Sequence, residues 1–434
     1  MMQMGVRNER RWWRAFPVQA RRRLVRGTVA VLLATCAAHG ASDKAKQKDV
    51  SPAPVARIRV APLGFLAQSP AYLQMRLAWS SLNFIDKDHL LFTFHVNELL
   101  HRAPGESRGD DDQMIRADVL EIATGKVVRT ADWRMYDRAR YIWALKDGKF
   151  LVRRGNELYL TDSSLQLKPY LAFRTDLQGV EVSPERTMML LEVKKVIPTA
   201  EMAEGDGGGQ APTLLGGGGT KPIETTRTEM LLVRPGEHTV LGRAQLRASG
   251  DVPLMEDGIV GMMHGSNSKQ WVAQEQTIQK RLEKVGKVES ACPPQTQVLS
   301  RDVVLLLGCP ANGANGNSVV ALKLGGKVLW EDRWGSRYIW PTFDYAEDGS
   351  RFAYESMETN RPVGTMDSFS QEDIVDQPVG VFDTKTGKLV LVENADPILS
   401  EGQNYALSAD GRRFAILRRG AIEVFDLPPV VAKK

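Results

Sequence analysis

One short unit recurs along the chain, and it limits the possible folds more than any other feature. Its clearest copy runs from Tyr405 through Asp410-Gly411 to Ile416 and has the form strand, turn, strand. Asp-Gly suits such a hairpin because Gly accepts a positive φ at little steric cost. The Asp-Gly pair returns at 147–148, 257–258 and 348–349, and weaker copies stand at 86–88, 183–185 and 300–302. The sequence therefore predicts seven such hairpins.

A second hairpin follows the first in most units. Its turn reads Thr-Gly-Lys at 124–126 and 386–388, and Gly-Gly-Lys at 325–327. Two hairpins give four antiparallel strands per unit, and the units repeat about every 54 residues between Lys87 and Asp410. This spacing is close to the ~40–50 residues of a propeller blade. The sequence predicts an all-β fold: a seven-bladed β-propeller of four-stranded antiparallel sheets.

The last unit supplies only three strands, and we expect an N-terminal segment to complete it. Arg57–Phe65 precedes the first full unit and lacks a hairpin partner. As the outer strand of the last blade it would close the ring and cover an exposed edge. The predicted organisation is a signal peptide (1–40), a polar tether (41–56), the propeller (57–427) and a short tail (428–434). Two separate β-sandwich domains are the alternative.

The N-terminus has the order of a secretory signal peptide. Arginines at 21–23 and 26 precede the apolar run Thr28–Ala38, and small residues before Ala41 offer a cleavage site. A run of about 11 residues is shorter than the ~20 that cross a bilayer, so we expect no transmembrane span. The predicted location is periplasmic or secreted. Twin-arginine export through Arg21-Arg22 and lipid anchoring at Cys36 are variants of this prediction.

The net charge argues against a nucleic-acid partner. The formal charge of the chain is +5, but the first 40 residues hold eight Arg and one Glu and contribute +7. The remainder therefore carries −2. A folded body near neutrality lacks the positive surface that dominates phosphate binding.

The Ser-x-Asp-Gly and Asp-x-x-Thr-Gly-Lys units of residues 57–427 resemble WD40-like and related bacterial β-propeller repeat proteins. The resemblance implies the fold and says little about function, because propellers serve many roles. Asp383-x-x-Thr386-Gly387-Lys388 is also distantly similar to the repeat of quinoproteins. That repeat has Trp three residues after the Lys, where this chain has Leu391. We therefore expect no quinone, and the sequence indicates no other cofactor.

Long insertions fall between the second and third strands of several units, so we expect all of them on one face of the ring. The three longest are acidic, with a combined charge of −7, and a smaller one lies at Pro310–Asn317; the long ones are His101–Arg116, Ile197–Thr228 and Met357–Pro378. Long loops on a rigid scaffold commonly bind ligands. We predict that this face binds a protein, peptide or glycan, with a cationic peptide, surface or divalent ion as the charge-matched partner. Solvated loops without a partner are the alternative.

Two cysteines remain after the leader, and we predict that they form a disulfide. Cys292 and Cys309 flank the hairpin centred on Ser300-Arg301. With a two-residue turn there, they would lie directly opposite each other on neighbouring strands, within disulfide reach. An oxidising compartment favours the bond.

Other candidate residues carry weaker signals. Asp110, Asp111 and Asp112 are calcium candidates, although they lack the alternating spacing and the Gly of a calcium loop. His89, His95 and His101 are six residues apart and match no metal-ligand pattern. Gln270–Val288 has a helix-like composition, whereas the repeat requires two strands there. Six tryptophans are expected to fill the space between blades: 133, 143, 271, 330, 334 and 340.

The sequence thus predicts an exported propeller, expected to be monomeric, that acts as a binding or protein-interaction module with an unknown ligand. It contains no G-x-S-x-G, H-E-x-x-H or Walker motif, and we assign no catalytic residue. A hydrolase or lyase that acts on an extracellular polymer is the alternative. Such an enzyme would need titratable groups that converge in the central channel.

Overall fold

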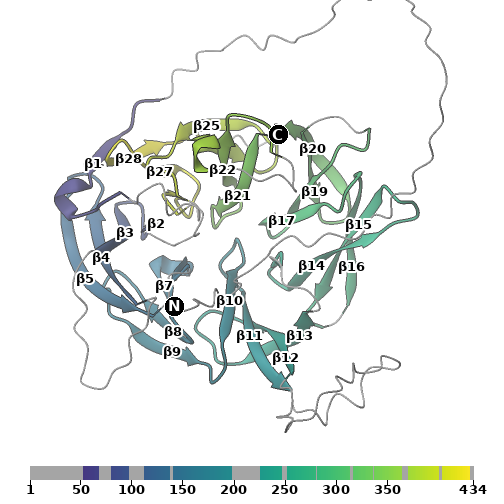
Figure 1. Ribbon diagram of the computed structural model, residues 1–434, viewed down its shortest axis with the longest axis horizontal. Coiled ribbons are helices and arrows are strands. Elements are labelled where there is room, and N and C mark those ends of the chain that lie inside the picture. Colours follow the sequence, from purple (N-terminus) through teal and green to yellow (C-terminus); the bar gives the residue numbers. More distant parts are fainter. Residues whose placement is uncertain are drawn as a thin grey trace, which may run out of the picture. The chain divides into compact units, whose positions relative to one another are not determined.

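The computed structural model describes residues 52–67, 80–96, 112–136, 140–197, 225–246, 252–279, 281–312, 316–335, 337–363, 370–399 and 403–430. The predicted signal peptide and Cys36 lie outside these residues. The described residues form seven antiparallel sheets arranged in a ring (Figure 1). We call the turn between the first and second strands of a blade its A–B turn, and the turn between the third and fourth its C–D turn.

The first three blades have four strands each, which follow one another from the centre of the ring outward (Figure 1). Blade one comprises β2 (Ser80–Phe84), β3 (His89–Val96), β4 (Gln113–Glu121) and β5 (Val127–Met135). Blade two comprises β6 (Ile142–Ala144), β7 (Phe150–Arg154), β8 (Glu157–Thr161) and β9 (Lys168–Ala172). Blade three comprises β10 (Leu177–Val182), β11 (Met189–Ile197), β12 (Thr225–Val233) and β13 (Val240–Leu246).

Blades four to six show the same plan with two local departures. Blade four comprises β14 (Gly258–His264), β15 (Gln270–Thr277) and β16 (Leu282–Glu289), and its first strand is reduced to the bridge Leu254–Ile259. Blade five comprises β17 (Gln295–Ser300), β18 (Val303–Gly308), β19 (Asn317–Lys323) and β20 (Lys327–Trp334). Blade six comprises β21 (Tyr338–Tyr345), β22 (Arg351–Thr359), β24 (Pro378–Asp383) and β25 (Leu389–Asn394), and the short β23 (Ile374–Asp376) also pairs with β22. Gln270–Val288 therefore forms two strands, as the repeat requires.

Blade seven joins the two ends of the described chain and confirms the predicted closure. Its strands are β26 (Tyr405–Leu407), β27 (Arg413–Arg418), β28 (Ala421–Asp426) and, outermost, β1 (Ala56–Arg59). β1 is shorter than the predicted Arg57–Phe65, because a 3₁₀ turn, η1 (Ala61–Leu63), follows it. Pro62 in this turn has no N–H to donate to a strand ladder. The part of the chain that the structure describes contains two further 3₁₀ turns, η3 (Lys146–Gly148) and η5 (Gln371–Asp373).

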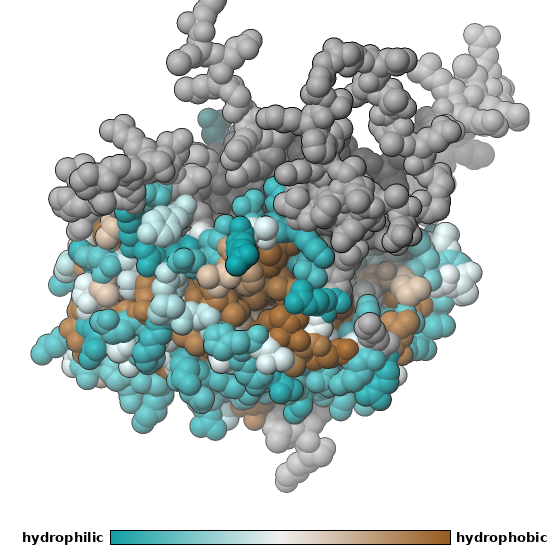
Figure 2. Space-filling view, turned by 90° about the horizontal axis from the view of Figure 1, so that it is seen from below, coloured by the Kyte–Doolittle hydropathy of each residue, from teal (hydrophilic) through white to brown (hydrophobic). Residues whose placement is uncertain are grey.

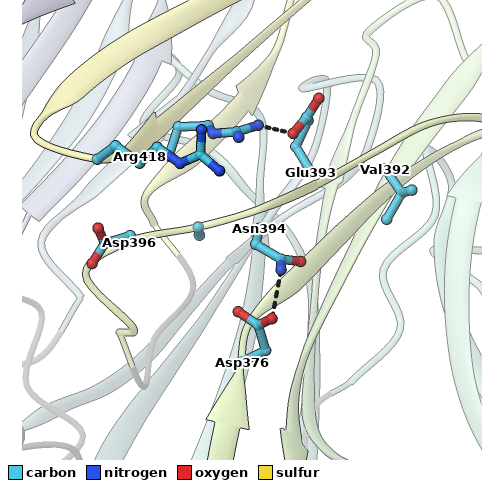
Figure 3. Close-up of a pocket in the computed structure, with 8 residues that line it drawn as sticks. Asp376, Val392, Glu393, Asn394, Asp396 and Arg418 are labelled. Carbon is cyan, nitrogen blue, oxygen red and sulfur yellow. Dashed lines mark hydrogen bonds and ion pairs between the residues drawn. The ribbon is translucent and has the colours of Figure 1, made fainter. Parts of the chain in front are cut away.

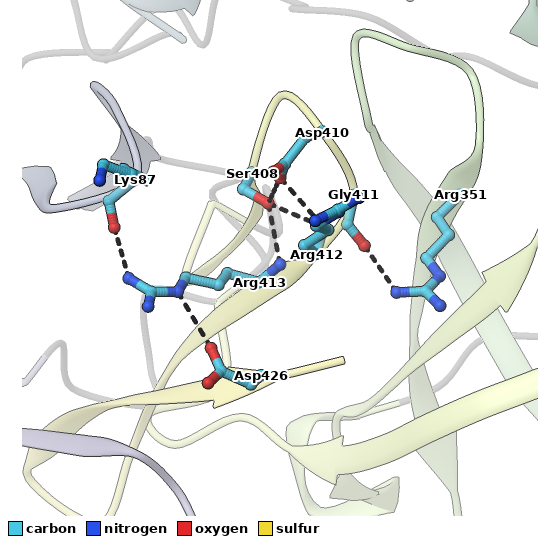
Figure 4. Close-up of polar contacts among 8 residues, drawn as sticks. All are labelled: Lys87, Arg351, Ser408, Asp410, Gly411, Arg412, Arg413 and Asp426. Carbon is cyan, nitrogen blue, oxygen red and sulfur yellow. Dashed lines mark hydrogen bonds and ion pairs between the residues drawn. The ribbon is translucent and has the colours of Figure 1, made fainter. Parts of the chain in front are cut away.

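The A–B turn of blade seven explains the Ser-x-Asp-Gly repeat (Figure 4). The Ser408 hydroxyl donates to the Asp410 carboxylate at 2.7 Å, and its oxygen accepts the N–H groups of Arg412 and Arg413 at 3.1 and 2.9 Å. Gly411 has a φ of +61°, which completes the turn. Serine and aspartate thus satisfy the backbone of a turn that glycine allows to form.

The same turn also connects blade seven to both neighbouring blades (Figure 4). The Arg413 guanidinium donates to the carbonyl oxygen of Lys87 in the A–B turn of blade one. From blade six, Arg351 Nη1 donates to the carbonyl oxygen of Gly411 at 2.6 Å. Arg351 is only 2% exposed, although it carries a charge. The A–B turns therefore hold the blades to one another as well as closing hairpins.

We expect Gly148→Ala, in the A–B turn of blade two, to destabilise the propeller by about 3 kcal/mol. Gly148 has a φ of +63°, and a Cβ there would lie 2.7 Å from the carbonyl oxygen of Ile85 in blade one. Gly236→Ala is the matched control, because Gly236 has a φ of +85° but nothing within 4 Å of its Cβ position. The control should lose only about 1 kcal/mol, the cost of the backbone conformation. Urea unfolding measures both values, and equal losses would contradict the packing role of Gly148.

Apolar side chains fill the space between neighbouring blades. One cluster joins blades one and two and includes Trp133, Ile142 and Phe150, and another joins blades two and three and includes Trp143. Figure 2 views the ring from its edge and shows apolar residues (brown) between hydrophilic ones (teal). Two indole N–H groups donate to carbonyl oxygens of the next blade, Trp133 to Leu165 and Trp330 to Thr384, whereas the buried Trp143 Nε1 has no hydrogen-bond partner among the described residues. The interblade role predicted for the tryptophans is confirmed for Trp133, Trp143, Trp330 and Trp334. Trp271 instead packs on His264 within blade four, and the side chain of Trp340 is not among those described.

The predicted disulfide between Cys292 and Cys309 is present, but the register predicted for it is wrong. Val298 pairs with Val304 and Ser300 with Val303, so a bulge interrupts the ladder beside the turn. The two cysteines lie beyond the ends of β17 and β18. The Ser290 Oγ holds them there, because it accepts the N–H of Cys309 at 3.0 Å and that of Cys292 at 3.3 Å.

Candidate functional site

The four insertions join the second strand of a blade to the third, as predicted. They connect β3 to β4, β11 to β12, β18 to β19 and β22 to β24. Because the second strands of all blades run in the same sense, these connections leave the ring on one side, which we call the insertion face. All four predicted insertions include residues that belong to strands. Gln113–Arg116 lie in β4, and β22 continues through Thr359 before the insertion of blade six adds the short β23. The others are Ile197 in β11, Thr225–Thr228 in β12, Asn317 in β19 and Pro378 in β24.

A pocket of about 370 Å³ opens on the insertion face between blades six and seven (Figure 3). Three segments far apart in the sequence form it: the end of β23, the end of β25, and the turn between β27 and β28. Its lining residues are Asp376, Val392, Glu393, Asn394, Ala395, Asp396, Arg418 and Arg419. The volume lies near the lower end of the range for small-ligand sites, about 300–1,000 Å³.

The turn between β27 and β28 places two arginines in different environments. Arg419 and Gly420 have φ values of +48° and +70°, as expected for the two central residues of a tight hairpin. Arg418 forms ion pairs with Glu393 and, at 3.3 Å, with Glu423, both of which are buried. Its charge is therefore compensated. Arg419 is exposed at the rim of the pocket.

The opposite wall is fixed by a buried amide. Gln377, which is 0% exposed, follows the lining residue Asp376. Its Nε2 donates to Glu355 at 2.7 Å, and its Oε1 accepts the Asn404 Nδ2 at 2.8 Å. Asp376 itself accepts the Asn394 Nδ2 at 2.5 Å (Figure 3). The insertion of blade six therefore ends in a defined position, with one carboxylate in the pocket.

A second, smaller cavity of about 160 Å³ lies beside the first and shares Asp396 with it. Its other lining residues are mostly apolar: Val60, Ala61, Phe65, Ala67, Pro397, Leu417 and Gly420. Asp396, which is exposed, thus stands between a charged pocket and an apolar one. The exposed Val375 and Val392 add apolar surface near the charged pocket.

The chemistry of this lining is suited to binding. It contains the carboxylates of Asp376, Glu393 and Asp396, and because Glu393 is paired with Arg418, Asp376 and Asp396 are the acidic groups that face an incoming ligand. Among the described residues that line the pocket there is no Ser, Cys or His. This arrangement can hold an ammonium or guanidinium group beside an apolar one.

The described structure leaves the three calcium candidates untested as a group. Asp110 and Asp111 lie outside the described residues, and Asp112 forms an ion pair with Arg134 at 2.7 Å. Of the three histidines, His89 contacts the Asp86 carboxylate at 3.0 Å, His95 lies in β3, and His101 is outside the description. Among the described residues, no group of three or more His, Cys, Asp or Glu side chains could hold a metal ion.

Sequence reasoning missed a charged cluster at the centre of the ring. Arg186, in the A–B turn of blade three, reaches Glu347 of blade six at 3.7 Å. Asp344 in β21 accepts the N–H of Leu407 at 2.7 Å, and burial raises the pKa of this carboxyl despite the nearby Arg186. Titratable groups therefore meet in the channel, so the hydrolase or lyase alternative stays a prediction. The signal in the sequence was Arg186 itself, which stands where other copies of the repeat have Gly.

The strand topology defines the class of this protein: it is a seven-bladed β-propeller, as its repeats and its resemblance to WD40-like proteins predicted. No helix among the described residues is long and apolar enough to cross a membrane.

No protein-family model and no curated protein sequence matches the chain. Among solved structures, it is similar to the acylaminoacyl peptidase of Pyrococcus horikoshii (10% identity, TM-score 0.44), over 81% of this chain and 51% of that one. It is also similar to the WD40 domain of Toxoplasma gondii coronin (10%, 0.44; 88% and 87% covered) and to TolB of Acinetobacter baumannii (11%, 0.35; 74% and 75%). The chain spans about half the length of the peptidase chain that it matches.

Proposed function

We propose that this protein is an exported propeller that acts as a protein-interaction module. Its insertion face would bind a protein or peptide that presents a Lys or Arg side chain. The observation that carries the proposal is the pocket between blades six and seven, which opens on the face from which all four insertions leave. Asp376 and Asp396 supply the negative charge, and the neighbouring cavity accepts an apolar side chain.

The surroundings favour a cationic partner. The segment Met357–Pro378, which includes the insertion of blade six and the end of β22, contains five acidic residues and one Arg. Charges of one sign around a pocket raise the local concentration of an oppositely charged partner and speed its association. Arg419 at the rim can pair with a carboxylate of the same partner.

A photo-crosslinking residue at position 392 tests this proposal. Val392 lines the pocket and is 45% exposed; Val328, at 44% exposure on β20 of blade five, is the matched control site. We expect crosslinks to an envelope protein from position 392 but not from 328, with Lys or Arg in the crosslinked partner peptide. Adding D376N and D396N should lower the yield about tenfold, since losing two charge-assisted contacts costs on the order of 1.4 kcal/mol or more.

A second pair of substitutions controls for loss of acidic charge in general. Asp88 and Asp332 are exposed carboxylates in blades one and five, away from the pocket. D88N with D332N should leave the yield from position 392 unchanged. The proposed binding site would be refuted if positions 392 and 328 gave equal crosslinking yields. It would also be refuted if D376N with D396N left the yield from position 392 unchanged.

A further inference from the structure

The A–B turn of blade three contains a buried carboxyl group that lacks a partner. Glu185 is 9% exposed, and neither of its carboxylate oxygens has a hydrogen-bond partner among the described residues. An ionised carboxylate in such a place is strongly unfavourable, so the group stays protonated to a higher pH. Burial, assisted by the nearby Glu256, raises the pKa of Glu185 to about 7.

The next residue is held in a backbone conformation that favours glycine. Arg186 has a φ of +59°, while Gly349 and Gly411, at the same place in other blades, have φ values of +69° and +61°. A side chain at such a φ costs free energy that glycine avoids. The Arg186 side chain is only 12% exposed and reaches across the ring to Glu347 of blade six. Non-glycine residues in strained positions often mark functional elements.

Charged groups from four other blades surround this turn. Lys146 belongs to blade two, Glu256 precedes the second strand of blade four, and Arg301 lies in the A–B turn of blade five. Arg301 is already paired with Glu256, as Arg186 is with Glu347. Of the two described cations that act on Glu185, Lys146 and Arg301, Arg301 already has a carboxylate partner. Asp344 of blade six also lies near Arg186. Glu185 and Arg186 are consecutive residues, so a charge on Glu185 would act on the same turn that holds the cross-ring ion pair.

We propose that Glu185 and Arg186 form a pH-sensitive latch at the centre of the ring. While Glu185 is protonated, Arg186 keeps its ion pair with Glu347, and this pair connects blade three to blade six. When Glu185 ionises, its charge draws Arg186 or Arg301 away from their present partners, and the A–B turn of blade three loosens. The latch is independent of the binding proposed for the insertion face, because it lies at the A–B ends of the blades.

The direction of the pH effect follows from the two protonation equilibria. The ordinary pKa of a glutamate is about 4.5. Below this pH, Glu185 is protonated in both the folded and the unfolded chain, so it does not change the free energy of unfolding. Between about 4.5 and about 7 the unfolded chain ionises first, so the folded state loses stability as the pH rises. Above about 7 the folded state ionises too, and the latch opens.

Hydrogen exchange of the turn amides tests the latch. In the closed turn the Arg186 N–H donates to the Ser183 carbonyl oxygen at 2.8 Å, and the Ser183 N–H to that of Met188 at 2.9 Å. After correction for the intrinsic exchange rate, we expect the protection of residues 183–188 in the wild-type protein to fall at least tenfold between pH 6 and pH 8. E185Q should show less than a twofold change, because glutamine does not titrate.

Two further variants complete the experiment. D348N removes the corresponding, exposed acid of blade six and should keep the tenfold fall. E347Q removes the partner of Arg186 and should give low protection at both pH values, which keeps the test decisive if E185Q does not fold. Three results would each overturn the latch. The protection of residues 183–188 in the wild type could stay unchanged between pH 6 and pH 8, or it could fall tenfold in E185Q as well. The third is strong, pH-dependent protection of the same residues in E347Q.

Discussion

A chain that lacks residues 53–60, and therefore β1, is expected to lose roughly 8 kcal/mol of folding stability. The deletion removes four ladder pairs with β28 and the side chains of Ile58 and Val60, which are 3% and 2% exposed. Each buried aliphatic side chain contributes about 1.5–3 kcal/mol and each hydrogen bond about 1 kcal/mol. The loss is comparable to the whole stability of many domains, about 5–15 kcal/mol.

Thermal unfolding and size-exclusion chromatography measure this outcome. The exposed edge of β28 should also promote association between copies, because an unpaired strand is a template for another chain. A chain that starts at Pro52 retains β1 and is the matched control. An unfolding midpoint shared by the deletion and the control would show that the ring does not depend on its N-terminal strand.

Replacing both cysteines by serine, in C292S with C309S, is expected to cost about 3 kcal/mol. The disulfide closes a loop with a sequence separation of 17, and constraining a loop of that size in the unfolded chain contributes this amount in the chain-entropy model. Urea unfolding of wild type and variant without reductant gives the difference directly. Dithiothreitol should lower the stability of the wild type to that of the variant and leave the variant unchanged. A difference below about 1 kcal/mol would mean that Ser290 and the β17–β18 ladder hold this corner unaided.

The blade count and the ring closure were predictable because they depend on local chemistry. An Asp-Gly turn with a preceding Ser satisfies its own backbone, as Ser408 does, and needs no distant residue. Seven such turns and one unpartnered strand therefore determine the architecture. The strand register of the β17–β18 hairpin was less predictable. A bulge between Val298 and Ser300 shifts the pairing beside the turn, and counting residues outward from the turn does not reveal such a bulge.

The pocket and the central cluster were not predictable, because their residues meet only after the ring closes. Asp376, Asp396 and Arg419 come from three segments, and their proximity depends on how blades six and seven pack. Glu185 and Glu347 belong to blades that are not neighbours. For the third blade the sequence still held a usable signal: a repeat that requires glycine carries Arg186 instead.

The pairing of β1 with β28 also has a consequence for biosynthesis. In the sequence, all the other blades lie between β1 and β28, so β1 has no partner strand until the intervening blades have been made. Domains assemble as their sequence emerges, and unpaired strands are exposed to wrong partners in the meantime. The sheet of blade seven can therefore form only after the whole propeller has been synthesised, and a chain that stops before β28 leaves β1 unpaired.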